Sequence, residues 1–225
     1  TKSCIPIKGQ DNHLNCIFEH PQSLPHTPPL YLLNSFHTEA ETTEALAKYP
    51  DLNWSNLKQN QYPRINAETL APFKHPTDEK QNWNPPGHGD VYACLADTHL
   101  EQLQAQGIEY LFLSNADNLG ASVDLSILGC MVAENRDCIM ETTPKTAADI
   151  KGGTVVSENG QLRLLEVAEV DDEHMTRFTT EFKVFNTNNI WLHIPSLIKA
   201  IQDKTLNTTP IFNRKTIADT PIIQI

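Results

Sequence analysis

Continuous apolar runs and amphipathic segments alternate along this chain. The runs at residues 30–33 and 110–113 consist of Leu, Tyr and Phe alone, as in strands that are buried on both faces of a largely parallel sheet. Polar residues and then helical spacing follow each run, over about residues 38–49 and again after Ser122. This order of strands and helices predicts an α/β fold.

Two pairs of residues have the spacing that marks the start of a helix. Thr38 stands three positions before Glu41, and Thr98 stands three before Glu101, which is the spacing of a capping box. Gly107 is placed to end the second helix. We therefore expect helices to begin near Thr38 and Thr98.

The second half of the chain predicts further strands. Asn159-Gly160 is a strong hairpin turn, so residues 153–170 should form two antiparallel strands. Residues 137–142 and 183–194 predict one strand each. The whole chain then predicts a mixed, mostly parallel sheet flanked by helices, with an antiparallel hairpin insertion. In such sheets, ligands bind at the carboxyl ends of the strands.

The charge balance narrows the class of partner. The 28 acidic residues outnumber the 17 basic ones, and the net charge of -11 argues against a nucleic-acid surface. No window approaches the roughly 18 to 20 consecutive apolar residues that a membrane span needs. With 225 residues, we expect one soluble, cytoplasmic domain over residues 1–225.

The loop at residues 85–90, Pro-Pro-Gly-His-Gly-Asp, is the first candidate for chemistry. Gly87 allows a backbone to approach a flat or anionic ligand closely, and His88 offers a donor to an oxygen. Asp90 is placed to cap the next helix. An ordinary tight loop before a helix is the alternative interpretation.

The second candidate loop, at residues 114–121, directly follows the buried run at 110–113. A carboxylate there can hold Mg²⁺, which favours one or two carboxylates together with substrate phosphates. Asp117 is therefore the best metal candidate in the chain. An Asx turn with a helix cap is the alternative.

Paired glycines and clustered amides suit a sugar. Gly152-Gly153 open the predicted hairpin, and a plain β-turn is the alternative there. The segment at residues 185–189 carries three asparagines, whose amides donate and accept at once, as sugar hydroxyls do. Turn-forming asparagines are the alternative. No nucleophile motif is present, so a covalent mechanism is not indicated.

Six segments together resemble one enzyme family in order and spacing. They are KQNQYPR at residues 58–64, PPGHGD at 85–90, SNADNLGA at 114–121, TPKTAADIKGGT at 143–154, LLEVAEV at 164–170 and FNTNN at 185–189. From about residue 30 onward, the chain is similar to the eukaryotic-type UTP-glucose-1-phosphate uridylyltransferase (UDP-glucose pyrophosphorylase) family. The resemblance implies a Rossmann-like fold of the nucleotide-diphospho-sugar transferase type.

The resemblance also implies roles for single residues. Gln59 and Gly87 match the family positions that contact uracil, and His88 matches the histidine that faces the α-phosphate and the sugar. Asp117 takes the magnesium position, so Mg²⁺ is the implied cofactor. The other implied sugar contacts are Asn115, Gly153, Glu166, Asn186 and Asn188.

Parts of the family pattern are expected outside this chain. A glycine-rich nucleotide loop that ends in Pro-Lys-Ser should lie just before residue 1, and Lys2 matches its phosphate-binding lysine. A second lysine and a β-helix domain with oligomer contacts should follow Ile225. We therefore expect residues 1–225 to be the central part of a longer enzyme, or a truncated one, with any homo-oligomer contacts made elsewhere.

The implied reaction joins UTP and glucose 1-phosphate into UDP-glucose and pyrophosphate. The sugar phosphate attacks the α-phosphorus in line, and Lys2, Asp117 and His88 are the expected catalytic residues. Two alternatives stay open. One is a non-catalytic nucleotide-sugar binding module, and the other is a pyrophosphorylase for another sugar phosphate, such as N-acetylglucosamine 1-phosphate.

Overall fold

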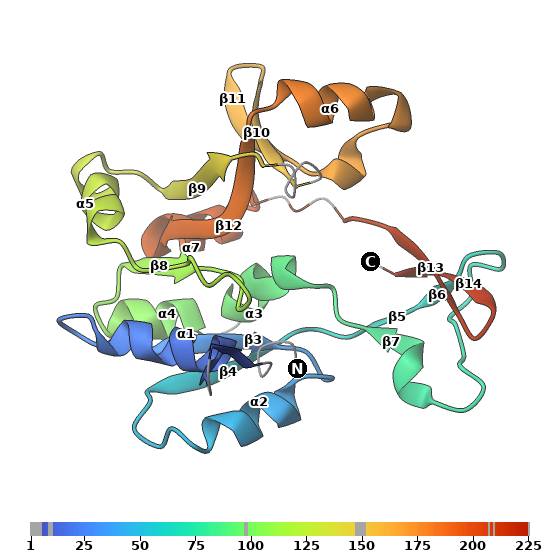
Figure 1. The fold of residues 1–225 in the computed structure, drawn as a ribbon, viewed down its shortest axis with the longest axis horizontal. Helices are drawn as coiled ribbons and strands as arrows, with labels where there is room; N and C mark the ends of the chain where they lie inside the picture. The colour runs from blue at the N-terminus through green and yellow to red at the C-terminus, as the bar shows by residue number, and fades with distance from the viewer. Residues whose placement is uncertain are drawn as a thin grey trace. The chain divides into compact units, whose positions relative to one another are not determined.

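The computed structural model describes residues 6–8, 11–96, 99–146, 152–206, 208 and 210–224. The chain divides into two compact units (Figure 1). Unit 1 comprises Thr1–Ile108 with Ile198–Ile225, and unit 2 comprises Glu109–Leu197. Within the described residues, no helix has the length and apolar character that crossing a membrane would require.

The core of unit 1 forms around one parallel strand pair. Strands β3 (Leu30–Asn34) and β4 (Trp54–Lys58) run side by side, and the helices α1 (His13–Gln22) and α2 (Glu39–Leu46) pack on them. Phe18 of α1 and Leu46 of α2 are each 1% exposed. Burial of each stabilises the unit by about 1.5–3 kcal/mol. These helices therefore fix the strand pair whose carboxyl end carries Gln59.

The remaining elements of unit 1 are short. Helices α3 (Val91–Ala96) and α4 (His99–Ala105) bury Leu95, Leu100 and Leu103. The strands are β1 (Pro6–Lys8), β2 (Asp11–Asn12), β5 (Tyr62–Pro63), β6 (Ile65–Asn66), β7 (Trp83–Asn84), β13 (Asn213–Ile217) and β14 (Thr220–Gln224). Single 3₁₀ turns cover Glu79–Asn82 and His88–Asp90.

A three-stranded antiparallel sheet is the centre of unit 2 (Figure 1). Strand β12 (Val184–His193) lies between β8 (Tyr110–Leu113) and β9 (Cys138–Pro144), and it is antiparallel to both. Trp191 of β12 is 2% exposed, and the centroid of its ring lies 4.6 Å from the ring centroid of Phe112 on β8. Helix α5 (Leu125–Ala133) connects β8 to β9, and α7 (Ile194–Gln202) follows β12.

A hairpin lies between β9 and β12 in the sequence. Strands β10 (Thr154–Glu158) and β11 (Gln161–Leu165) pair antiparallel around Asn159 and Gly160, which have φ angles of 54° and 80°. Both angles are those of a tight hairpin turn. The predicted hairpin insertion is confirmed. After it come two 3₁₀ turns, at Val167–Glu169 and Asp172–His174, and helix α6 (Met175–Glu181).

The mixed α/β class is confirmed, but the expected mostly parallel sheet is not. Among the described strands, β3 and β4 form a parallel pair, while the other pairings are antiparallel. Strands β8 and β9 do run in the same direction, since each is antiparallel to β12. The apolar runs do form strands, but all four residues of each run are only half-buried, so the expected full burial on both faces is not observed. The apolar runs did not indicate that β12, which comes much later in the sequence, lies between β8 and β9.

The starts of the helices differ in detail from the predicted capping boxes. Helix α2 does follow Thr38, but the Thr38 hydroxyl donates to Asn34 Oδ1 and accepts from the Ser35 N–H, so it caps nothing. The capping-box prediction is wrong there, because those two groups at the end of β3 take the hydroxyl. Thr98 lies outside the described residues. Helix α5 has a cap that the sequence analysis did not assign, since Asp124 accepts from the Ser126 N–H at 2.7 Å.

Candidate functional site

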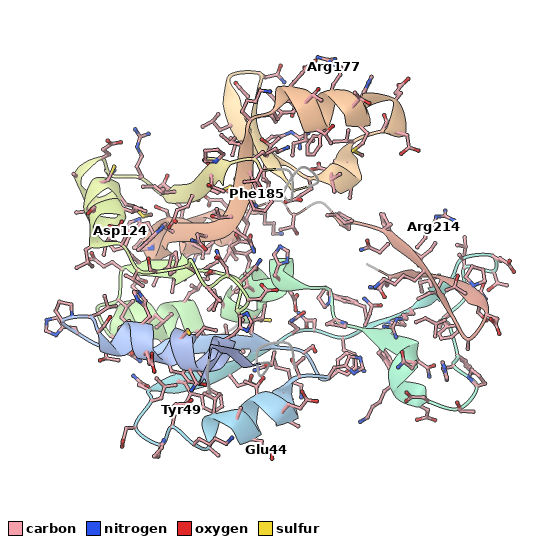
Figure 2. The ribbon with its side chains drawn as sticks, in the orientation of Figure 1. Glu44, Tyr49, Asp124, Arg177, Phe185 and Arg214 are labelled. Carbon is pink, nitrogen blue, oxygen red and sulfur yellow. The ribbon has the colours of Figure 1, made fainter. Side chains whose placement is uncertain are left out.

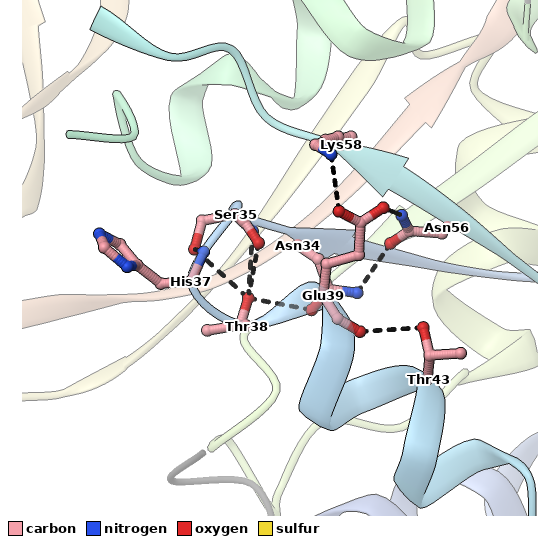
Figure 3. A network of polar contacts seen from close by, with 8 residues as sticks. All are labelled: Asn34, Ser35, His37, Thr38, Glu39, Thr43, Asn56 and Lys58. Atoms are coloured by element: carbon pink, nitrogen blue, oxygen red, sulfur yellow. Dashed lines mark hydrogen bonds and ion pairs between the residues drawn. The ribbon is translucent and has the colours of Figure 1, made fainter. Parts of the chain in front are cut away.

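A polar network ties the carboxyl ends of β3 and β4 to the start of α2 (Figure 3). Asn34 Nδ2 donates to Asn56 Oδ1 at 2.8 Å, and Asn56 Nδ2 donates to Glu39 Oε1 at 2.9 Å. The second oxygen of Glu39 pairs with Lys58 Nζ at 2.7 Å. Asn34 is 6% exposed, so its amide is held within protein. The network fixes the backbone from which Gln59 emerges.

Gln59 joins the network to the loop at residues 85–90. Its N–H donates to the carbonyl oxygen of Asn34 at 2.8 Å, which extends the strand pairing by one residue. Its side-chain oxygen accepts from the Gly87 N–H at 3.1 Å. Gly87 has a φ of 95°, a conformation that favours glycine. Gln59 and Gly87, the two residues predicted to contact uracil, are therefore hydrogen-bonded to each other.

Asp90 holds this loop in place rather than capping α3. Its carboxylate accepts from the Asn60 N–H at 2.6 Å and from Asn60 Nδ2 at 3.0 Å. The predicted cap is wrong, because the backbone and side-chain amides of Asn60 take the carboxylate. Cys94 adds a thiol contact to Asp90 at 3.5 Å, and burial together with the Asp90 charge raises the pKa of that thiol to about 11. His88, beside Gly87, is exposed.

In unit 2, Asp117 lies at the tip of the turn that follows β8. The Asn118 N–H donates to the Asn115 carbonyl at 3.1 Å, and Asn118 Oδ1 accepts from the Gly120 N–H. The Asx turn of this loop is thus made by Asn118, and the helix cap by Asp124. Asp117 is exposed, and no described residue donates to its carboxylate. Neither structural alternative for Asp117 therefore applies.

An irregularity in β12 brings Asn188 to this turn. Between Asn186 and Ile190, β12 advances four residues while β9 advances two. Such bulges re-aim side chains and recur beside active sites. Asn188 has a φ of 59°, its N–H donates to Asn186 Oδ1, and its Nδ2 donates to Asn115 Oδ1 at 2.7 Å. The predicted sugar residues Asn115 and Asn188 are in contact.

A Cβ atom at Gly152 or Gly153 would overlap a neighbouring side chain. A Cβ on Gly152 would lie 1.7 Å from the ring of Phe185, which stands on β12 (Figure 2). A Cβ on Gly153 would lie 2.6 Å from a carboxylate oxygen of Glu166. The Gly153 carbonyl accepts from the Asn186 N–H at 2.8 Å. Three of the predicted sugar contacts, Gly153, Glu166 and Asn186, thus lie together.

One predicted residue cannot be placed, and two residues near the Asp117 turn were not predicted. Lys2 lies outside the described residues. Glu141 and Asn189, which bond to each other beneath the Asp117 turn, were not assigned a role from the sequence. The position of Asn189 in the amide-rich segment at 185–189 could have indicated a role for it. No feature of the sequence around Glu141 indicated one. Among the described residues, no three His, Cys, Asp or Glu side chains gather as a metal cluster.

Comparison with known proteins identifies the family. The family model described as UTP--glucose-1-phosphate uridylyltransferase matches residues 1–225. A probable UTP--glucose-1-phosphate uridylyltransferase of Schizosaccharomyces pombe is 45% identical over 195 residues, 84% of this chain and 38% of that protein. The UTP--glucose-1-phosphate uridylyltransferase of Solanum tuberosum is 38% identical over 234 residues, 100% of this chain and 49% of that protein.

Solved structures agree with the sequence relatives. A UDP-glucose phosphorylase from Trypanosoma brucei has a TM-score of 0.90 and 32% identity, over 99% of this chain and 53% of that one. A variant UDP-glucose pyrophosphorylase from Leishmania major, in complex with UDP-glucose, has a TM-score of 0.86 at the same identity and coverage. The chain spans about half the length, or less, of these relatives. By the match of the family model and by its curated relatives, this chain belongs to the UTP-glucose-1-phosphate uridylyltransferase family.

Proposed function

We propose that the protein to which this chain belongs transfers the uridylyl group of UTP to glucose 1-phosphate, giving UDP-glucose and pyrophosphate. A phosphate oxygen of the sugar phosphate bonds to the α-phosphorus of UTP as the bond to the β-phosphate breaks. Pyrophosphate leaves with that electron pair. The observation that carries the proposal is the exposed Asp117 carboxylate, which lies on a turn held by the Asn115–Asn188 contact. Residues 1–225 are then proposed to be a single nucleotidyltransferase catalytic domain of a cytoplasmic protein.

The chemistry of the Asp117 turn fits Mg²⁺. Since no described residue donates to the carboxylate, its oxygens are available to a hard cation, and Mg²⁺ favours one or two carboxylates with phosphates and water. The same preference explains why no cluster of three ligating side chains is needed among the described residues. When bound, Mg²⁺ supplies positive charge to the phosphates of UTP. Lys2 is proposed to add its ammonium group there.

The remaining site residues divide between the two substrates. Gln59 and Gly87 present a linked pair of backbone and side-chain polar groups, which suits recognition of the uracil edge. His88, exposed beside them, is proposed to face the α-phosphate and the sugar. The glucose hydroxyls are proposed to meet Asn115, Gly153, Glu166, Asn186 and Asn188. No side chain becomes covalently attached, so the residues act by positioning and by charge.

An assay of pyrophosphate release by the full-length protein tests the proposal. With UTP, glucose 1-phosphate and Mg²⁺, we expect steady release that stops when any one of the three is omitted. Binding of UDP-glucose without release would indicate a non-catalytic binding module instead. Replacing glucose 1-phosphate by galactose or N-acetylglucosamine 1-phosphate tests the sugar assignment, and faster release with either would contradict it.

A further inference from the structure

We propose that Glu141 and Asn189 are positioning residues that fix the turn carrying Asp117. This inference rests on the function proposed for Asp117, which the pair does not contact. Glu141 lies on β9, Asn189 lies in the bulge of β12, and the turn follows β8. The Glu141–Asn189 pair therefore links all three strands of the unit 2 sheet near the end of β8, where the turn that carries Asp117 begins.

Every polar atom of the Asn189 amide is engaged. Asn189 as a whole is 3% exposed, and its Nδ2 donates to Glu141 Oε2 at 3.1 Å. Its Oδ1 accepts from Ser114 Oγ at 2.8 Å and from Asn118 Nδ2 at 3.1 Å. Ser114 and Asn118 stand on either side of Asp117 in the sequence. Asn189 thus holds both ends of the turn with a single oxygen.

Glu141 dictates which way this amide faces. Its Oε1 accepts from Nε1 of the buried Trp191 at 2.7 Å, which ties the carboxylate to the neighbouring strand β12. An ionised carboxylate only accepts hydrogen bonds, whereas an amide donates from one side and accepts on the other. The Asn189 nitrogen must therefore face Glu141, and its oxygen must face the turn.

The Asn188 side chain completes the arrangement. Its Nδ2 donates to Asn115 Oδ1 at 2.7 Å, so adjacent asparagines of one bulge hold three residues of the turn: Ser114, Asn115 and Asn118. Asp117 itself has no described partner that would hold it. Its position comes from the turn, and small displacements of a catalytic group cost much of its effect.

A swap of charge between the two residues tests the proposal. In Glu141→Gln, an amide nitrogen faces either Asn189 Nδ2 or Trp191 Nε1, which puts two donors together. In Asn189→Asp, two carboxylates face each other. In the double variant Glu141→Gln with Asn189→Asp, the glutamine nitrogen donates to the aspartate, and the other aspartate oxygen still accepts from Ser114 and Asn118. Each single variant breaks the pattern, and the pair restores it with the same total charge.

The readouts separate positioning from mere stability. In the full-length protein we expect both single variants to exchange amide hydrogens faster over residues 114–121. We also expect weaker Mn²⁺ binding in the presence of UTP, measured by electron paramagnetic resonance, and a kcat lower by about 10- to 100-fold. The KM for glucose 1-phosphate should change little. The double variant should recover all three quantities. Glu134→Gln, the same change at an exposed carboxylate paired with Arg136, is the control and should leave them unchanged.

The outcomes also distinguish this proposal from the function on which it rests. Unchanged exchange over residues 114–121 in both single variants overturns the proposal, and so does a double variant no better than the worse single one. If the wild-type protein releases no pyrophosphate, the proposed function fails instead. In that case the exchange and Mn²⁺ measurements still decide whether the pair fixes the turn. Faster exchange with unchanged Mn²⁺ binding and kcat would also overturn it.

Discussion

A carboxylate oxygen of Glu166 lies 2.6 Å from the place that a Cβ atom on residue 153 would occupy, so this position accepts only glycine without a shift of Glu166. The backbone of Gly153 is fixed as well, because its carbonyl accepts from the Asn186 N–H. The side chain that must move in a substituted protein is therefore Glu166, which is proposed to bind glucose.

Replacing Gly153 by alanine should impair the sugar side of the reaction selectively. Displacing the Glu166 carboxylate removes a charge-assisted hydrogen bond, so we expect the KM for glucose 1-phosphate to rise on the order of 10-fold or more. The KM for UTP should stay close to its original value. Initial-rate kinetics with each substrate varied in turn measure both.

Gly129→Ala is the matched control for this substitution. Gly129 lies within α5, and a Cβ there meets no atom within 4 Å, so the kinetics should be unaffected. The fold should be kept, since alanine is more favourable than glycine inside a helix by about 1 kcal/mol. A Gly153→Ala variant with an unchanged KM for glucose 1-phosphate would contradict the placement of Glu166 in the sugar site.

Gln59→Ala should weaken the binding of UTP more than the binding of glucose 1-phosphate. The substitution removes both the proposed uracil contact and the acceptor of the Gly87 N–H, and loss of one such bond is about tenfold in affinity. Titration of each substrate against the full-length protein measures the two effects. Gln61→Ala, an exposed position in the same segment, is the control. Equal weakening of both substrates would refute the uracil assignment.

The reactivity of Cys94 reports on the loop that contains Gly87 and His88. Burial and the Asp90 charge raise the pKa of this thiol to about 11, so it is almost fully protonated near neutral pH. Because the thiolate is the reactive form, alkylation should be slow at neutral pH and should quicken as pH rises toward that value. Asp90→Asn removes the negative charge, so the pKa should fall and alkylation should quicken at lower pH.

Mass spectrometry of iodoacetamide-treated protein measures this pH dependence. Cys130, which is exposed, serves as an internal reference in the same sample. Equal alkylation rates at Cys94 and Cys130 between pH 7 and pH 9 would be inconsistent with the raised pKa.

Local patterns in the sequence predicted β3, the hairpin and the three strands of the unit 2 sheet, but not β4, the parallel partner of β3. Apolar runs located β3 and β8, and the Asn159-Gly160 turn located the hairpin, because each depends on neighbouring residues alone. The direction of the sheet was not predictable in this way. It depends on β12, which pairs with residues 40 or more positions earlier in the chain.

For the candidate site, too, local patterns indicated residues but not the contacts between distant residues that hold them. Residue types indicated Asp117 and the asparagines of the segment at 185–189, and the family resemblance implied Gln59. The hydrogen bonds that hold them join residues far apart in the sequence, such as Asn188 with Asn115 and Asn189 with Glu141. Asp90 and Thr38 were assigned as caps because the local sequence allows it. In the structure Asp90 instead bonds to Asn60, 30 positions earlier, whereas Thr38 bonds to its near neighbours Asn34 and Ser35.

Magnesium-dependent pyrophosphate release by the Asp117→Ala variant of the full-length protein tests the central claim most directly. Because Asp117 is exposed and holds no described residue, the melting temperature should stay near that of the wild type. Turnover should fall by about 100-fold or more, since the proposed ligand of the metal is gone. A folded variant that keeps near-normal, magnesium-dependent turnover would contradict the account.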